Sequence, residues 1–111
     1  MLSKFKVWAT VPATDLGRAV GFYTDTLGLK KVSQDDEMKH AVVEAGDATK
    51  IEIYERPPAK SEHTLATFEV KDIESVVGDL TGKGVAMEEY DMGEIKTTNG
   101  IATVGSEKAG W

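Results

Sequence analysis

Apolar and polar residues alternate at the start of the chain and then change to a helical spacing. Over residues 4–11 every second position is apolar, which predicts a half-buried strand. Pro12 should end this strand, because proline has no N–H to donate to a ladder. Asp15 then supplies a helix N-cap, and apolar residues at helical spacing over 16–27 predict a helix that ends at Gly28.

The pattern after this helix predicts a run of short strands. Gly17 lowers the helix's stability by roughly 1 kcal/mol relative to alanine, so we expect it where the helix packs closely on a sheet. Turn residues at 35–36 and 46–47 separate the predicted strands, which cover residues 29–34, 40–45 and 50–56.

A second copy of the same pattern begins after a connector with two prolines, residues 57–63. Residues 64–70 predict a strand, and Asp72 caps a predicted helix with apolar residues at helical spacing. Adding about 57 to the numbers of the first helix carries Asp15 onto Asp72, with a strand before each helix at the same offset. The sequence therefore predicts one domain, 1–111, made of module one (about 4–56), the connector and module two (about 64–111).

One stretch of the first module resembles a known family signature. Residues 11–29 read V-P-A-T-D-L-G-R-A-V-G-F-Y-T-D-T-L-G-L, similar to the D-L-x-R-A-x-x-F-Y-x-x-x-L-G-L signature of the vicinal oxygen chelate superfamily. That superfamily contains glyoxalase I, bleomycin resistance proteins and extradiol dioxygenases. Residues 68–74, F-E-V-K-D-I-E, resemble the start of its second module.

The resemblance implies an α+β fold in which two βαβββ modules form an open cleft, commonly within a homodimer. In the family a D-P-x-G-N turn and a closing strand end the second module, and neither follows Trp111. We therefore expect a second module shortened at its C-terminus. Equal module lengths would place its last strand near 106–111.

The resemblance also assigns positions for metal ligands. Carried over to this sequence, they fall on Trp8, Glu52 and Leu65, of which only Glu52 can bind a metal. We therefore expect no cofactor and no tightly held metal. A divalent metal would need Glu52 together with other ligands, such as His63 or residues of a second subunit.

Strand alternation predicts which side chains line the cleft. The residues opposite the helix-packed positions are mostly aromatic, apolar or singly charged, which is typical of an organic-ligand pocket. Trp8 and Tyr54 could stack on a planar or cationic ligand, or instead fill a core or dimer interface. Glu52 is the candidate general base or counter-ion, or else a solvated strand residue, and His40 is interpreted as a surface residue. The predicted ligand-binding set is Trp8, Thr10, Glu52, Tyr54, Leu65, Thr67 and Glu69, with His63 at its mouth.

Charge and composition narrow the classes of partner. The chain has 13 basic and 19 acidic residues, a formal charge of −6, and no basic run, which argues against nucleic acid or an anionic membrane. No apolar stretch approaches the roughly 20 residues of a membrane span. The absence of cysteine excludes disulfides and thiolate sites and is compatible with the cytoplasm, where we expect the protein.

The leading hypothesis is a binding or resistance-type protein that holds a small organic molecule in the cleft. One alternative is a lyase, isomerase or dioxygenase in which a divalent metal polarises vicinal oxygens. Another is a degenerate or structural module held together by dimerisation. The sequence leaves open whether the protein is an enzyme.

Overall fold

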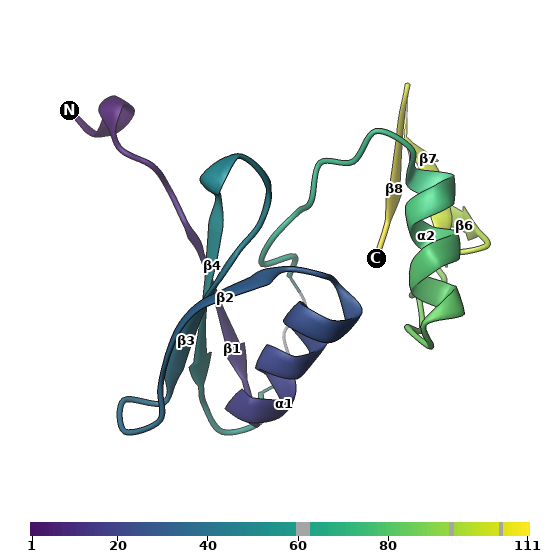
Figure 1. Ribbon diagram of the computed structural model, residues 1–111. Helices are drawn as coiled ribbons and strands as arrows, with labels where there is room; N and C mark the ends of the chain where they lie inside the picture. Colours follow the sequence, from purple (N-terminus) through teal and green to yellow (C-terminus); the bar gives the residue numbers. More distant parts are fainter. Residues whose placement is uncertain (60–62, 94, 105) are drawn as a thin grey trace. The chain divides into compact units, whose positions relative to one another are not determined.

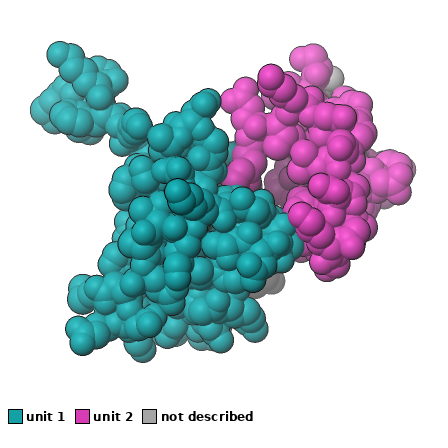
Figure 2. Space-filling model, in the orientation of Figure 1, with its two compact units in different colours: residues 1–67 teal, residues 68–111 magenta. Residues whose placement is uncertain are grey.

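The computed structural model describes residues 1–59, 63–93, 95–104 and 106–111. The chain divides into two compact units, residues 1–67 and residues 68–111, shown in teal and magenta in Figure 2. Each unit contains an α-helix and a four-stranded sheet. The protein therefore has the α+β architecture that the sequence predicts.

Unit 1 is a mixed sheet with one helix (Figure 1). The strand order is β1-β4-β3-β2, in which β1 runs parallel to β4 and the other pairs are antiparallel. The turn between β3 and β4 contains a short 3-10 helix, Gly46–Ala48, and another, Leu2–Lys4, precedes β1. The principal elements are β1 (Ala9–Ala13), α1 (Leu16–Gly21), a π-helix (Phe22–Thr26), β2 (Lys30–Asp35), β3 (His40–Glu44) and β4 (Lys50–Glu55).

The residues predicted to begin and end the first helix do so in the structure. The Asp15 side chain accepts a hydrogen bond from the Arg18 N–H at 3.0 Å, which confirms the N-cap. Gly28 has φ +77, the left-handed conformation expected just beyond a helix end. Between them the α-helix gives way to a π-helical turn, in which the Leu27 N–H donates to the Phe22 carbonyl.

The core of unit 1 lies between α1 and one face of the sheet. Leu16 and Val20 of α1 pack on alternate residues of the central strands, such as Val43 and Ile53, which are fully buried. Tyr23 packs against the edge of this cluster, and its burial raises the pKa of the Tyr23 hydroxyl. The remaining buried members of the cluster are Val11, Ala41 and Ile51.

Three details of unit 1 differ from the prediction. Strand β1 begins at Ala9 rather than near residue 4, and the preceding residues Phe5 and Val7 are exposed. The strand continues through Pro12, which an edge strand tolerates because its missing N–H is not needed by a second neighbour. A Cβ at Gly17 would meet only an Asp15 oxygen at 3.7 Å, so no close approach to the sheet explains that glycine.

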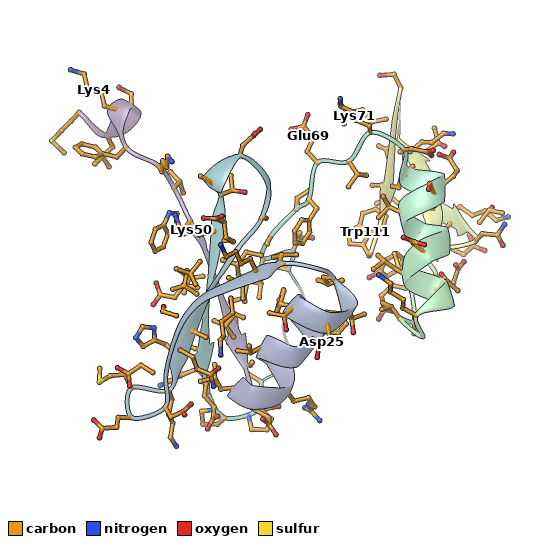
Figure 3. The ribbon with its side chains drawn as sticks, in the orientation of Figure 1. Lys4, Asp25, Lys50, Glu69, Lys71 and Trp111 are labelled. Carbon is orange, nitrogen blue, oxygen red and sulfur yellow. The ribbon has the colours of Figure 1, made fainter. Side chains whose placement is uncertain are left out.

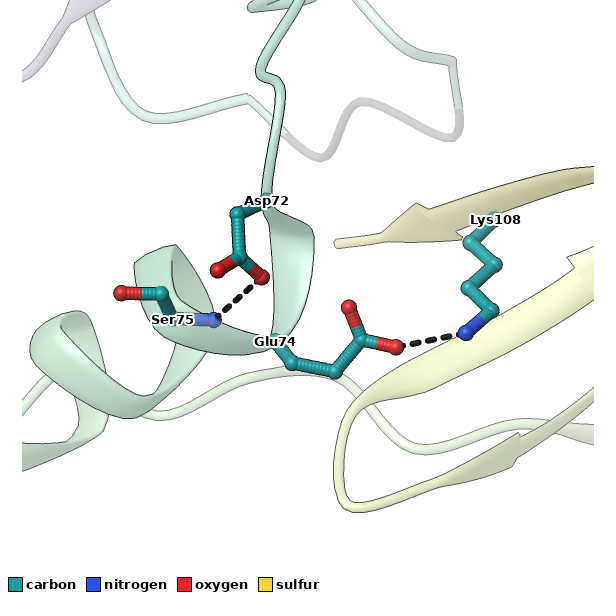
Figure 4. Close-up of polar contacts among 4 residues, drawn as sticks. All are labelled: Asp72, Glu74, Ser75 and Lys108. Carbon is teal, nitrogen blue, oxygen red and sulfur yellow. Dashed lines mark hydrogen bonds and ion pairs between the residues drawn. The ribbon is translucent and has the colours of Figure 1, made fainter.

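Unit 2 repeats the local contacts of unit 1 around its helix. Asp72 accepts a hydrogen bond from the Ser75 N–H at 3.2 Å and caps α2, Ile73–Gly82 (Figure 4). The Thr81 hydroxyl donates to the Val77 carbonyl, as the Thr24 hydroxyl of unit 1 donates to its own preceding turn. An antiparallel sheet follows, with strands β5 (Asp91–Met92), β6 (Ile95–Thr98), β7 (Ile101–Val104) and β8 (Glu107–Gly110) in that order.

The strand predicted over residues 64–70 is absent from the structure. These residues form neither helix nor strand, and Phe68 and Val70, which alternation would turn inward, are 47% and 38% exposed. Ala66 alone packs against the core of unit 1. An alternating sequence becomes a strand only where a neighbouring backbone is present to pair with it.

No helix in the described ranges has the length and apolar character needed to cross a membrane. The cytoplasmic location and the homodimer remain predictions.

Candidate functional site

The face of the unit 1 sheet that points away from α1 gathers several of the predicted site residues. Glu52 on β4 is paired with Thr10 of β1 on one side and with Val42 of β3 on the other. One step along, Tyr54 is paired with Pro12 and with His40. Because directly opposite residues of neighbouring strands share a face, these two rows form one continuous surface. We call it the outer face.

Trp8 stands at one end of the outer face, just before β1. The Lys50 ammonium lies 5.1 Å from the centre of its ring, within the range of a cation–π contact. The same ammonium is 3.8 Å from the Glu44 carboxylate. Lys50, labelled in Figure 3, has a side chain only 20% exposed, whereas Trp8 is 43% exposed. The aromatic ring thus has a fixed cationic neighbour and remains accessible to solvent.

Glu52 and His40 form a second polar pair on the outer face. His40 Nδ1 lies 4.0 Å from Glu52 Oε1, and both side chains are about two-fifths exposed, at 36% and 40%. The Nδ1 atom itself is buried and has no hydrogen-bond partner among the described residues.

Sequence reasoning missed two members of this face. Lys50 precedes Glu52 by two residues, so the alternation that places Glu52 outward places Lys50 there as well. His40, interpreted from the sequence as a surface residue, has a side chain that is 36% exposed and lies beside Glu52. The signal for His40 was the β3–β4 hairpin, because antiparallel pairing about the turn at Asp47 brings His40 opposite Tyr54.

The remaining predicted residues lie in the segment that forms no strand. Leu65 and Thr67 are exposed residues of unit 1, and His63 is also exposed. Glu69 belongs to unit 2 and is exposed there. Their membership of one site with Glu52 stays a prediction.

Unit 2 contains a separate open hollow of about 980 Å³ between α2 and its sheet. Apolar side chains such as Val77, Met87 and Ile101 line it, and Glu74 and Lys108 stand among its lining residues. These two residues form an ion pair of 2.6 Å between α2 and β8 (Figure 4).

A comparison with known protein families shows which family the chain belongs to. The sequence profile of the Glyoxalase/Bleomycin resistance protein/Dioxygenase superfamily matches residues 7–99. The chain belongs to this superfamily. Within it, unit 1 supplies a complete strand–helix–three-strand module.

Solved structures of other proteins share this fold. An integron cassette protein from the mobile metagenome of the Halifax Harbour sewage outfall is 22% identical, with a TM-score of 0.65 and 76% of each chain covered. The fosfomycin resistance protein FosX of Listeria monocytogenes is 17% identical, with a TM-score of 0.62, covering 86% of this chain and 78% of that one.

A third structure is the bleomycin-binding protein of bleomycin-producing Streptomyces verticillus, complexed with copper(II)-bleomycin. It is 25% identical, with a TM-score of 0.54, and the match covers 74% of this chain and 66% of that one. A search of curated proteins gave no match.

The residues of this chain do not fit the metal set of the superfamily's metal-dependent members. Two of the three positions that can be carried over hold Trp8 and Leu65, whose side chains are not metal ligands. In the part of the chain that the structure describes, no three His, Asp or Glu side chains converge into a group able to hold an ion.

Proposed function

We propose that the protein binds a small organic molecule on the outer face of unit 1, without a tightly held metal. One observation carries the proposal: Trp8, Glu52 and Tyr54 lie on the sheet face that α1 leaves uncovered, and Trp8 and Glu52 remain two-fifths exposed. Aromatic surface with a few oriented polar groups is the usual lining of a ligand site. A planar part of the ligand would stack on Trp8, and a cationic or hydrogen-bond-donating part would meet Glu52.

The bleomycin-binding relative supports this class of function, because its structure holds a large organic ligand, copper(II)-bleomycin. It also supplies a first probe. Calorimetric titration of the protein with copper(II)-bleomycin, and then with smaller aromatic amines, would test whether the outer face binds such compounds.

Two substitutions locate the binding. We expect Trp8→Ala to weaken binding by roughly tenfold, since an aromatic pair contributes about 0.5–1.5 kcal/mol beyond area burial. Glu52→Gln should weaken the binding of a cationic probe by at least tenfold, because hydrogen bonds to charged groups contribute about 1.5–3 kcal/mol. Phe5→Ala, which removes an exposed aromatic outside the sheet, is the matched control. Unchanged affinity in both site variants would reject the outer face as the site.

The metal-dependent alternative, a lyase, isomerase or dioxygenase, has one observation in its favour. His40 Nδ1 and Glu52 Oε1 offer a nitrogen and an oxygen donor 4.0 Å apart, and the Nδ1 has no hydrogen-bond partner among the described residues. A metal enzyme would need further ligands from water, substrate or other residues. It predicts that a divalent metal stabilises the chain through both Glu52 and His40.

A further inference from the structure

Two side chains of β4 with opposite charges lie on the outer face. Lys50 and Glu52 are separated by a single residue on β4, so their side chains leave the same face about 7 Å apart. Trp8 stands beside Lys50, and His40 stands beside Glu52. A ligand lying along β4 would therefore meet an ammonium beside an aromatic ring at one end and a carboxylate beside an imidazole at the other.

Lys50 is arranged to receive an anion. Its side chain is four-fifths covered, yet within the described residues none of its N–H groups has a hydrogen-bond acceptor. Glu44 lies at 3.8 Å, which is an electrostatic neighbour but too far for a hydrogen bond. An anionic oxygen of a ligand would supply the missing acceptor. The position of Lys50 over Trp8 also disfavours a second cation on that ring face, because like charges repel.

Glu52 is arranged to receive a cation. Its carboxylate side chain is 40% exposed, so a ligand ammonium can donate to it a charge-assisted hydrogen bond of about 2.9 Å. The His40 ring lies beside this carboxylate, with Nδ1 4.0 Å from Glu52 Oε1, and forms the neighbouring wall of the position.

We propose that the outer face selects a bipolar ligand, with an anionic group bound by Lys50 beside Trp8 and an ammonium-type group bound by Glu52 beside His40. This inference rests on the proposed function and specifies the ligand class. Neither charged group alone would use both ends of the face, so a molecule carrying both should bind more tightly than one carrying either.

Three aromatic probes test this selectivity. In 4-(aminomethyl)benzoate the amine and the carboxylate lie at opposite ends of one benzene ring, a span comparable with the two-residue step on β4. Benzylamine carries only the cation and benzoate only the anion. The chain has two tryptophans, so in Trp111→Phe the fluorescence reports Trp8 alone. We expect 4-(aminomethyl)benzoate to bind at least tenfold more tightly than either of the other two.

Substitutions at the two ends should act on different charges. In the Trp111→Phe background, Lys50→Met should reduce the affinity of the bipolar probe to that of benzylamine and leave benzylamine unchanged. Glu52→Gln should do the reverse, lowering the affinity of the bipolar probe to that of benzoate. Lys31→Met is the control, because Lys31 is an exposed lysine of β2 paired with Val43 of the α1-facing side. Thermal unfolding of each variant shows whether it is folded.

The outcomes separate the two proposals. If benzylamine binds through Glu52 but the bipolar probe binds no more tightly, the outer face is a cation site and the bipolar inference is wrong. If Lys50→Met and Lys31→Met weaken the bipolar probe equally, Lys50 makes no specific contact and the inference is also wrong. If none of the three probes changes Trp8 fluorescence, both the inference and the proposed site are overturned.

Discussion

At the scale of single residues, two glycines, Gly17 inside α1 and Gly28 beyond the end of the helical segment, have opposite backbone requirements. Gly28 has φ +77, where an L-residue is strained although a Cβ there would meet no atom within 4 Å. We expect Gly28→Ala to lower the free energy of unfolding by about 1–2 kcal/mol. Gly17 lies inside α1 with room for a Cβ. Gly17→Ala should therefore raise the free energy of unfolding by roughly 0.5–1 kcal/mol. Urea unfolding of both variants checks the signs, and a destabilised Gly17→Ala would contradict the helical assignment at that position.

Individual residues were predicted best where a local rule decides them. Asp15, Asp72 and Gly28 act as caps because capping depends only on neighbours in the chain. Glu52 was placed on the outer face by alternation within one strand. His40 needed the register between two strands, and its pairing with Glu52 also depends on rotamers, which no sequence pattern records.

At the scale of elements, one ion pair connects the helix and the last strand of unit 2. The hydrogen bond from Lys108 and its charge lower the pKa of Glu74 below the usual 4.5, and the same contact raises the pKa of Lys108 above 10.5. The lowered pKa of Glu74 gives stability that is present above pH 4.5 and is lost as the pH falls through the folded-state value. The raised pKa of Lys108 gives stability that is present below pH 10.5 and is lost as the pH rises through its folded-state value.

Glu74→Gln should therefore destabilise unit 2 at pH 7 but not in acid. We expect the thermal unfolding midpoints of the variant and the parent to converge as the pH is lowered below 4.5. Asp79→Asn, which changes another exposed carboxylate of α2, is the control and should show no such convergence. A constant difference between Glu74→Gln and the parent across this range would show that the ion pair does not stabilise the unit.

The elements themselves were predictable where partners are close in sequence. Strands β2, β3 and β4 follow one another through short turns, and each lies within two residues of its predicted bounds. The segment 64–70 has an equally regular alternation but forms no strand. Alternation shows that a segment is able to pair, whereas pairing itself depends on a distant backbone.

At the scale of the whole molecule, the superfamily hosts both binding proteins and metal enzymes, and a stability measurement separates them. A metal at about 100 times its dissociation constant would stabilise the protein by roughly 2.7 kcal/mol, which raises the unfolding temperature by several degrees. We expect no such shift when the metal-stripped protein is heated with Zn²⁺, Ni²⁺, Fe²⁺ or Mn²⁺. A shift with one metal that both Glu52→Gln and His40→Ala abolish would instead establish the metal-dependent alternative.

The two units also differ in how much apolar surface they bury, which predicts unequal local stability. In unit 1 the helix and three strands enclose fully buried side chains such as Val43 and Ile53. In the described part of unit 2 the buried side chains are Val77, Thr97 and Ala102, and residues of both α2 and the sheet line an open hollow. Regions with few buried apolar contacts open at lower free energy than a packed core.

Amide hydrogen exchange should therefore divide along the boundary between the units. We expect the amides of β3 and β4 to exchange most slowly and those of α2 and β7 markedly faster. Ile53→Val, which costs about 0.5–1.5 kcal/mol, should accelerate exchange in unit 1, since the removed methylene leaves a void in a closed core. Val77→Ala should accelerate amide exchange in unit 2 alone. Equal protection of α2 and β4 in the parent protein would mean that the two units unfold as one, and that the hollow does not weaken unit 2.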